Sequence, residues 1–430
     1  MKFKLLSAVI LTALSATAFS ATEQTFSDGL KIKLNEKSTG SDLRIYNGKP
    51  VLAISSPDKS KISHNYFDEF NVGKEGMYIG NYKGANTIIT EVVSHSPSLL
   101  NGNIDIIGKL GTLVIANPNG ITTSSGFGVS NIKNLELATA KIVSSSDGNR
   151  VEKMKNINDG KLSLINSKIN GLEKLSLISN NISIENSNVG IKELHSHSLV
   201  SAKYESRGSG EYTSGYFPYK TEKMIITRSP SKLFIDDKSA LNVNNIHINL
   251  LETEFVNNGH IEGNIVSINS KQTPSAYYSD IVDIGNVVHV RNKGTIYSNV
   301  LNLNANSSAL ENHGKIIANK KANIDLSHST FTNYNQMDII RNYHSKTSLT
   351  LDNSQFINKG KMRAKDLQVN YYTNSKLINS GDMYISYYQE DDVNHYHYDE
   401  DEREQFSKEN TGNLYVYNPF NHEYKKIESL

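Results

Sequence analysis

Cysteine is absent from the 430 residues of the chain. Disulfide bonds, which stabilise many small exported proteins, are therefore excluded, and packing and hydrogen bonding must hold the fold together. A chain without covalent loops is also suited to passing unfolded through a pore.

Tryptophan is also absent, and neither sign of charge predominates. The formal net charge is +1 and 21% of the residues are charged, so the composition predicts no nucleic-acid partner. The 23 tyrosines suit solvated strand faces, where the ring packs and the hydroxyl stays hydrated.

Long hydrophobic runs are missing beyond the N-terminus. There, two lysines precede an apolar run over residues 5–14, and residues 18–20 (Ala-Phe-Ser) supply a small-x-small cleavage site. This pattern predicts a Sec-type signal peptide over residues 1–20. The apolar run is too short to span a membrane, and we expect no transmembrane segment in the mature chain from about Ala21 onward.

Helical periodicity is nearly absent as well. Short runs with apolar residues at alternating positions dominate, as at residues 43–46, 162–165 and 246–250, and Asn, Gly, Ser and Asp separate them. Period-2 runs bounded by turn residues predict an all-β protein.

The second half of the chain repeats the pattern apolar-x-Asn-x-Gly-x-apolar, with Asn replacing Gly in one copy. Successive copies start 35, 20, 21, 25 and 21 residues apart, which indicates a period of about 20 to 21 residues with inserted loops. The copies occupy residues 255–261, 290–296, 310–316, 331–337, 356–362 and 377–383, with a degenerate copy at 410–414.

Strand-only repeats of this length predict a parallel β-helix, in which each coil stacks on the previous one. We expect the Asn and Gly at the corners because both tolerate positive φ, and we expect stacked Asn amides to hydrogen-bond from coil to coil. At this period the mature chain would form roughly 15 to 20 coils and a rod about 80 Å long.

Two segments interrupt the repeats. Residues 203–232 are rich in Tyr, Ser, Gly and Lys and predict a protruding hairpin or loop; residues 389–405 are acidic and predict an insertion in a terminal coil. His395 and His397 would share one face of a strand, with six carboxylates between residues 391 and 402, which suggests a metal site. An exposed charged loop is the better interpretation because no third ligand has a defined spacing. We therefore predict no metal and no cofactor.

The most informative motif is the turn at residues 117–120, Asn-Pro-Asn-Gly, which separates two apolar runs. Proline fixes φ at the second position of a type I turn, Asn suits the first and Gly the last. Upstream, in order, lie the blocks at residues 62–72, 87–92 and 98–109.

In this order and spacing, the blocks resemble the secretion domain of two-partner secretion exoproteins. That family includes filamentous haemagglutinin-like adhesins, haemolysins of the Serratia and Proteus type, and contact-dependent inhibition proteins. The resemblance implies a right-handed parallel β-helix with small extra-helical hairpins. It also implies export through Sec and the periplasm of a Gram-negative bacterium, where a cognate outer-membrane β-barrel transporter with periplasmic polypeptide-binding domains recognises the chain. The recognition motif implied in this way comprises His64, Asn65, Phe70, Asn71, Glu91, Asn117, Pro118, Asn119 and Gly120.

The expected organisation is a signal peptide (1–20), a secretion domain (21–270) and a β-helical extension with an acidic terminal insertion (271–430). Members of the family generally run far longer, which makes this a short member. The expected function is that of a secreted, non-enzymatic small adhesin or haemolysin-like surface factor that contacts a host or neighbouring cell surface. Two alternatives remain: a secreted β-helical polysaccharide-degrading enzyme, which would need paired carboxylates on neighbouring coils, and a truncated remnant of a larger adhesin or contact-dependent toxin.

Overall fold

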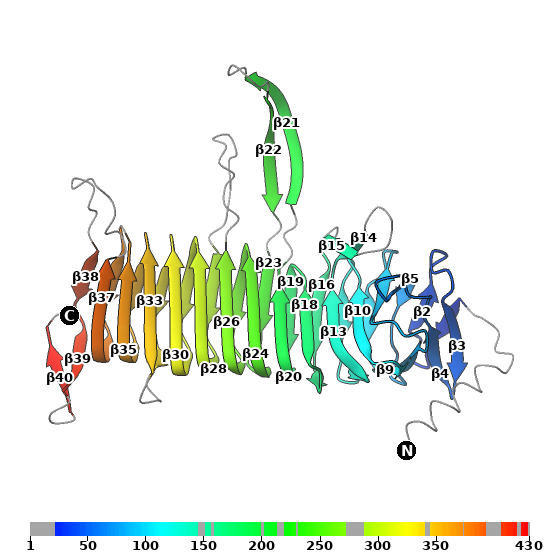
Figure 1. Ribbon diagram of the computed structural model, residues 1–430, viewed down its shortest axis with the longest axis horizontal. Helices are drawn as coiled ribbons and strands as arrows, with labels where there is room; N and C mark the ends of the chain where they lie inside the picture. Colours follow the sequence, from blue (N-terminus) through cyan, green and yellow to red (C-terminus); the bar gives the residue numbers. More distant parts are fainter. Residues whose placement is uncertain are drawn as a thin grey trace.

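Stacked β-strands make up the regular structure of the described residues, and no helix occurs among them. The computed structural model describes residues 22–144, 151–155, 159–198, 202–212, 219–228, 231–271, 288–339, 345–372, 374–392, 406–418 and 423–428. The expected signal peptide lies outside these residues. The fold is a right-handed parallel β-helix with a straight long axis, as predicted (Figure 1).

One sheet receives a single short strand from each coil, and all its pairings are parallel. Its twelve strands are β8 (Ser98–Leu100), β11 (Ile121–Thr123), β16 (Lys161–Ile165), β19 (Asn181–Glu185), β23 (Ser231–Ile235), β25 (Thr253–Asn257), β27 (Val288–Asn292), β29 (Ser308–Asn312), β31 (Thr330–Asn333), β34 (Gln355–Asn358), β36 (Lys376–Asn379) and β38 (Ser407–Asn410).

A second, larger sheet completes the coils with longer strands, parallel from β5 to β39. Its nineteen strands are β1 (Glu23–Thr25), β2 (Lys31–Leu34), β5 (Ile62–Phe70), β7 (Thr87–Val92), β10 (Gly111–Ala116), β13 (Ile132–Ala138), β17 (Lys168–Asn170), β18 (Lys174–Ile178), β20 (Asn188–His197), β24 (Ala240–Leu251), β26 (His260–Lys271), β28 (Thr295–Asn306), β30 (Lys315–Ser327), β32 (Gln336–Ile339), β33 (Lys346–Asp352), β35 (Lys361–Tyr371), β37 (Asp382–Asp392), β39 (Asn413–Asn418) and β40 (Glu423–Ile427).

Antiparallel strands cover both ends of the stack (Figure 1). At the N-terminal end β1 pairs with β2 and β2 with β5; at the C-terminal end β40 pairs with β39. A third sheet begins with an antiparallel hairpin and continues in parallel through the first coils. Its strands are β3 (Asp42–Tyr46), β4 (Lys49–Ala53), β6 (Met77–Asn81), β9 (Asn103–Gly108) and β12 (Gly128–Ser130).

The register confirms the repeat period. His260 pairs with Thr295 and Thr295 with Lys315, and these steps of 35 and 20 residues equal the spacings of the sequence repeats. The expected number of coils is too high, since the sheet with one strand per coil contains twelve strands in the described part of the chain. Eleven steps between twelve strands give a stack about 50 Å long. The shortfall arises because the N-terminal strands and the hairpins use chain without adding coils.

The two apolar positions of each repeat form two columns inside the helix. Phe331 lies directly over Phe356, with ring centroids 5.1 Å apart and planes 5° apart. Ile296 and Ile316 pair in register in the second column and are 2% exposed. One continuous hydrophobic cluster runs from Phe26 to Leu414. Each fully buried side chain of this size contributes about 1.5–3 kcal/mol, so stacking on the previous coil stabilises every new coil.

The repeat asparagines form a buried ladder, as predicted. Each side-chain amide donates from Nδ2 to Oδ1 of the next asparagine at 2.7–2.9 Å. The ladder comprises Asn257, Asn292, Asn312, Asn333, Asn358, Asn379 and Asn410.

The expected positive φ at these corners is wrong for both the ladder asparagines and the repeat glycines. Where the repeat has glycine, the coils approach too closely for a side chain, whereas the copy at residues 331–337 accommodates Asn335, whose Nδ2 donates to the His313 carbonyl oxygen at 3.1 Å. A Cβ on Gly294 would lie 2.0 Å from the carbonyl oxygen of Gly259, and one on Gly314 would lie 2.0 Å from that of Gly294. The left-handed residues occupy another corner and include Asn166, Asn186, Glu252, Ser307, His328 and Asn353.

Two hairpins lie outside the coils. The first pairs β14 (Lys141–Ser144) with β15 (Val151–Lys155), and the second pairs β21 (Ala202–Tyr212) with β22 (Tyr219–Arg228). The second extends clear of the stack (Figure 1), as expected, although residues 231–232 belong to β23. Residues 389–392 of the acidic segment are the end of β37 rather than an insertion, and residues 393–405, including His395 and His397, lie outside the described residues.

Candidate functional site

The turn at residues 117–120 has the predicted form. β10 ends at Ala116, β11 begins at Ile121, and the Gly120 N–H donates to the Asn117 carbonyl oxygen at 3.1 Å. Gly120 has φ 122°, which a residue with a side chain rarely adopts. Pro118 is buried.

The two asparagines of this turn bond to the preceding coil through a run of serines. Asn117 donates from Nδ2 to the Ser96 carbonyl oxygen and to Ser98 Oγ, both at 2.9 Å, and Asn119 donates to the Ser94 carbonyl oxygen at 2.8 Å. Asn117 is fully buried, with 0% exposure. Its side chain therefore fixes the turn to the coil before it and offers no surface to a partner in the folded chain.

His64 and Glu91 form a hydrogen-bonded pair on the outer face of the larger sheet. His64 Nε2 lies 2.8 Å from Glu91 Oε2, and His64 Nδ1 lies 3.2 Å from the Tyr66 hydroxyl. The rings of His64 and Tyr66 stack with centroids 4.2 Å apart. Burial and the neighbouring Glu91 charge raise the pKa of Tyr66, so its hydroxyl stays protonated.

The β14–β15 hairpin covers this carboxylate. The Ile142 N–H donates to Glu91 Oε1 at 3.0 Å. The Ile142 side chain joins Ile89, Val114 and Ala116 in a small hydrophobic cluster outside the main core. Only 3% of the Glu91 side chain is exposed, so the hairpin shields the carboxylate from water. The hydrogen bond from the Ile142 N–H replaces the water that one carboxylate oxygen loses.

The remaining predicted residues are internal. Phe70 is fully buried and packs edge-on against Phe67. Asn65 accepts from the Ser55 N–H at 2.8 Å and donates to the Ile89 carbonyl oxygen at 3.1 Å. These contacts tie β5 to its neighbours.

Asn71 bridges the N-terminal end to the second coil. It donates to the Lys31 carbonyl oxygen at 2.9 Å and accepts from the Leu99 N–H at 2.9 Å. Lys31 lies in antiparallel β2 and Leu99 in parallel β8, so this one side chain joins the two arrangements of strands.

The structure brings these residues into one block of adjacent strands. Glu91 pairs in register with Ala116, immediately before the turn, and with Tyr66 on its other side. Sequence reasoning missed the alternating serines at residues 94, 96 and 98 and the contact with Ile142. The serine spacing was a usable signal, whereas the hairpin contact joins residues 51 apart with no shared pattern.

A second cluster lies on the outer face farther along the stack. Glu193 and His195 on β20 and His247 on β24 place one ligand atom each within 4.8 Å of one another. His195 pairs in register with His247, and their ring centroids lie 4.8 Å apart. Burial, then the charges of His195 and Lys174, lower the pKa of His197; burial and His195 do the same for His247.

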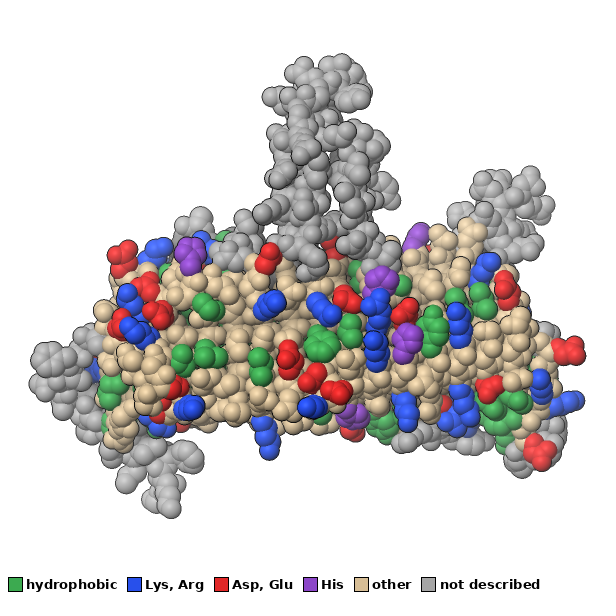
Figure 2. All heavy atoms as spheres, turned by 180° about the vertical axis from the view of Figure 1, so that it is seen from behind, with side chains coloured by type: hydrophobic (Ala, Val, Ile, Leu, Met, Phe, Trp, Pro, Cys, Tyr) green, Lys and Arg blue, Asp and Glu red, His purple; other side chains and the backbone are tan. Residues whose placement is uncertain are grey.

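The outer surface carries both signs of charge. On the face shown in Figure 2, Lys and Arg side chains are interspersed with Asp and Glu along the rod, and hydrophobic side chains are scattered. No helix in the described residues is long and apolar enough to cross a membrane.

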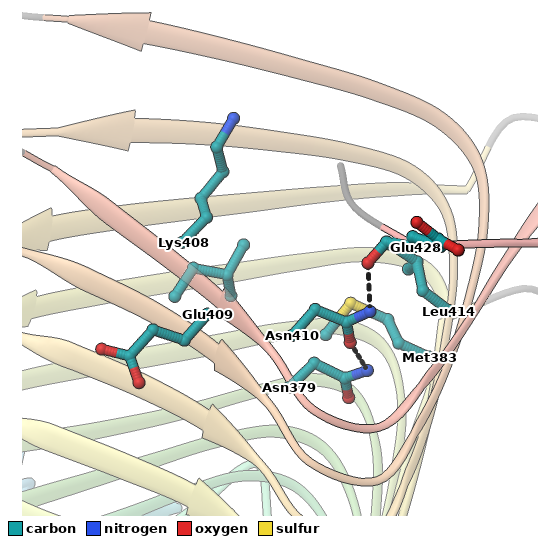
Figure 3. A pocket seen from close by; sticks show the side chains of 8 residues that line it. Asn379, Met383, Lys408, Glu409, Asn410, Leu414 and Glu428 are labelled. Atoms are coloured by element: carbon teal, nitrogen blue, oxygen red, sulfur yellow. Dashed lines mark hydrogen bonds between the residues drawn. The ribbon is translucent and has the colours of Figure 1, made fainter.

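A small cavity lies at the C-terminal end, where the asparagine ladder stops (Figure 3). Asn410, the last member, donates to the Glu428 carbonyl oxygen at 2.7 Å. The apolar part of the cavity lining consists of Leu377, Met383 and Leu414.

The chain is thus a parallel β-helical domain. Its first coils contain the turn at residues 117–120, whose asparagine side chains bond to the preceding coil. The TPS secretion domain family matches residues 31–316, more than half of the chain. The chain therefore belongs to this family, that of the two-partner secretion exoproteins. The match extends past the expected boundary at residue 270, and the division of the chain at that residue stays a prediction.

Similar proteins share only a short part of their length with this chain. The tRNA nuclease CdiA of Yersinia mollaretii is 36% identical over 123 residues, which cover 24% of this chain and 4% of that protein. The filamentous hemagglutinin of Bordetella pertussis is 34% identical over 124 residues (24% and 3%), and the hemolysin of Proteus mirabilis is 35% identical over 104 residues (19% and 7%).

Among solved structures, a crystal structure of the filamentous hemagglutinin secretion domain matches 89% of this chain and 99% of that chain, at 15% identity and a TM-score of 0.36.

Proposed function

We propose that this chain is exported through Sec and the periplasm of a Gram-negative bacterium and that a cognate outer-membrane β-barrel transporter recognises its secretion domain. The observation that supports this most directly is the family match over residues 31–316. All nine residues of the predicted recognition motif fall inside it.

Recognition takes place, in this proposal, before the coils stack. Asn117 is 0% exposed in the folded chain and Glu91 is covered by the β14–β15 hairpin, so a transporter would reach these side chains only in an unfolded segment. The periplasmic polypeptide-binding domains expected of the transporter suit an extended segment. The absence of cysteine leaves the chain free of covalent loops during transit.

Stacking outside the cell then opposes return of the chain. Each emerging repeat adds one apolar side chain to each of the two buried columns and one asparagine to the ladder. Every repeat that has passed the membrane therefore stabilises the folded stack.

The experiment compares two buried asparagines. Asn117→Ile lies in the motif, whereas Asn358→Ile removes an equally buried ladder amide outside residues 31–316. In pulse-labelled cells that express the transporter, we expect Asn117→Ile to remain in the periplasm while Asn358→Ile crosses the outer membrane. Normal extracellular levels of Asn117→Ile, or equal retention of both variants, would contradict recognition of the motif.

Outside the cell we propose that the chain acts as an adhesin or haemolysin-like surface factor rather than as an enzyme. The extended stack with the projecting β21–β22 hairpin supports contact with another surface (Figure 1). The nuclease names belong to proteins of which this chain spans 4%. Cell-binding and erythrocyte-lysis assays on the secreted chain test this part, and inactivity in both would overturn it.

A further inference from the structure

We propose that Glu193, His195 and His247 bind a divalent transition-metal ion of the zinc class that links two neighbouring coils. This proposal is independent of the secretion function. It depends on two residues of β20 and one of β24, which the parallel register brings together although 52 residues separate the two histidines.

The donor set suits such an ion. Two imidazole nitrogens and one carboxylate oxygen are a common set for Zn²⁺ that leaves a fourth position to water. The ligand atoms lie within 4.8 Å of one another, so small rotations of the side chains suffice to converge on one ion. His195 Nε2 already contacts Glu193 Oε1, so two of the three ligand atoms face each other where an ion would bind.

Two neighbouring residues, His197 and Lys174, influence the proposed site in opposite ways. His197 Nδ1 lies 3.3 Å from Asn249 Nδ2, which fixes a ring beside His195. Lys174 pairs in register with Glu193 and is the cation that opposes metal binding here. Removal of this charge by Lys174→Gln should therefore tighten metal binding.

The position of the cluster indicates its effect. β20 ends at His197 and the β21–β22 hairpin begins at Ala202, so the ion would join the coils on either side of the largest described insertion (Figure 1). A ligand that binds only the folded chain stabilises it in proportion to the logarithm of its concentration over the dissociation constant. Zinc should thus raise the melting temperature.

The chain offers a matched control. His260 Nε2 lies 3.2 Å from Glu262 Oε2, which is the same His–Glu contact, but the neighbours of His260 in register are Ala240 and Thr295. His260→Asn should leave zinc binding unchanged. Asparagine is a suitable replacement at residue 247, because Asn302 occupies an equivalent outer position two coils farther along.

The test is calorimetric titration of the full chain with zinc chloride, with circular dichroism to verify folding of each metal-free variant. We expect His195→Asn and His247→Asn to weaken zinc binding at least tenfold and to abolish the zinc-dependent rise in melting temperature. Absence of zinc binding in the wild type, or unchanged affinity in both variants, would overturn the proposal. So would loss of binding confined to a His395→Asn/His397→Asn variant, which would locate the ion in the acidic segment.

Discussion

The Glu91 carboxylate bonds to His64 through one oxygen and to the Ile142 N–H through the other, so it joins β5 to the β14–β15 hairpin across the outer face of β7. Removal of the carboxylate leaves both donors without their partner in a buried position. We expect Glu91→Ala to lower the free energy of unfolding by about 3 kcal/mol.

Glu91→Gln keeps a carbonyl oxygen for Ile142, and we expect a loss of only about 1 kcal/mol. Urea unfolding monitored by circular dichroism measures both variants. The exposed pair His260–Glu262 serves as the control, since Glu262→Ala should change stability by less than about 0.5 kcal/mol. An Ala variant at residue 91 as stable as this control would show that the contact contributes nothing.

The asparagine ladder should be strong inside the stack and weak at its end. Asn312→Ala removes the acceptor of Asn292 and the donor to Asn333 in a fully buried position, and we expect a loss of about 2–4 kcal/mol. Asn410→Ala, at the partly exposed C-terminal end, should cost about 1 kcal/mol. Equal losses at both positions, measured by urea unfolding, would contradict a cooperative role for the ladder.

The repeat glycines should not tolerate a side chain, because a neighbouring coil lies too close and not because their backbone needs positive φ. A Cβ on Gly294 would lie 2.0 Å from the Gly259 carbonyl oxygen in the preceding coil, so Gly294→Ala must push two coils apart and should cost about 3 kcal/mol or more. Gly40 has φ +77° and open space around it, and Gly40→Ala should cost about 1–2 kcal/mol from backbone conformation alone. Urea unfolding measures both variants, and a loss for Gly294→Ala no larger than that for Gly40→Ala would contradict the steric explanation.

The repeated features were predictable because each follows from a local pattern copied along the chain. Asn292 and Asn312 stack because both occupy the same place in a repeat, and the period alone places one over the other. The role of Gly294 was not predictable in the same way. A sequence does not distinguish a glycine that is needed for positive φ from one that is needed because the backbone of a neighbouring coil lies too close for a side chain.

Contacts across insertions were not predictable. The hairpin between β20 and β24 changes a step of about 20 residues to one of 52, so no periodicity relates His195 to His247. The same holds for Glu91 and Ile142, where an extra-helical hairpin folds back onto strands of earlier coils. In the motif block the turn itself was predictable from Pro118 and Gly120, and the alternating serines at residues 94–98 were a usable signal for its partners in the preceding coil.

Stability should also depend on pH through Glu136. This side chain lies in register beside Val114, which is buried under the β14–β15 hairpin, and burial raises the pKa of Glu136 while Lys174 opposes the shift in part. A carboxyl whose pKa is raised by folding contributes stability that is complete below its unfolded value of about 4.3 and is lost as the pH rises through the folded value. Glu136→Gln abolishes this loss.

We therefore expect Glu136→Gln to be more stable than the wild type at pH 7 and the difference to shrink as the pH falls toward about 4. Urea unfolding at a series of pH values measures the difference directly. Glu262→Gln provides the control, since half of the Glu262 side chain is exposed and its replacement should change stability by less than about 0.5 kcal/mol at each pH. A stability gain for Glu136→Gln that grows on acidification would mean that the charged form is the one the fold prefers, and that Lys174 outweighs burial at this position.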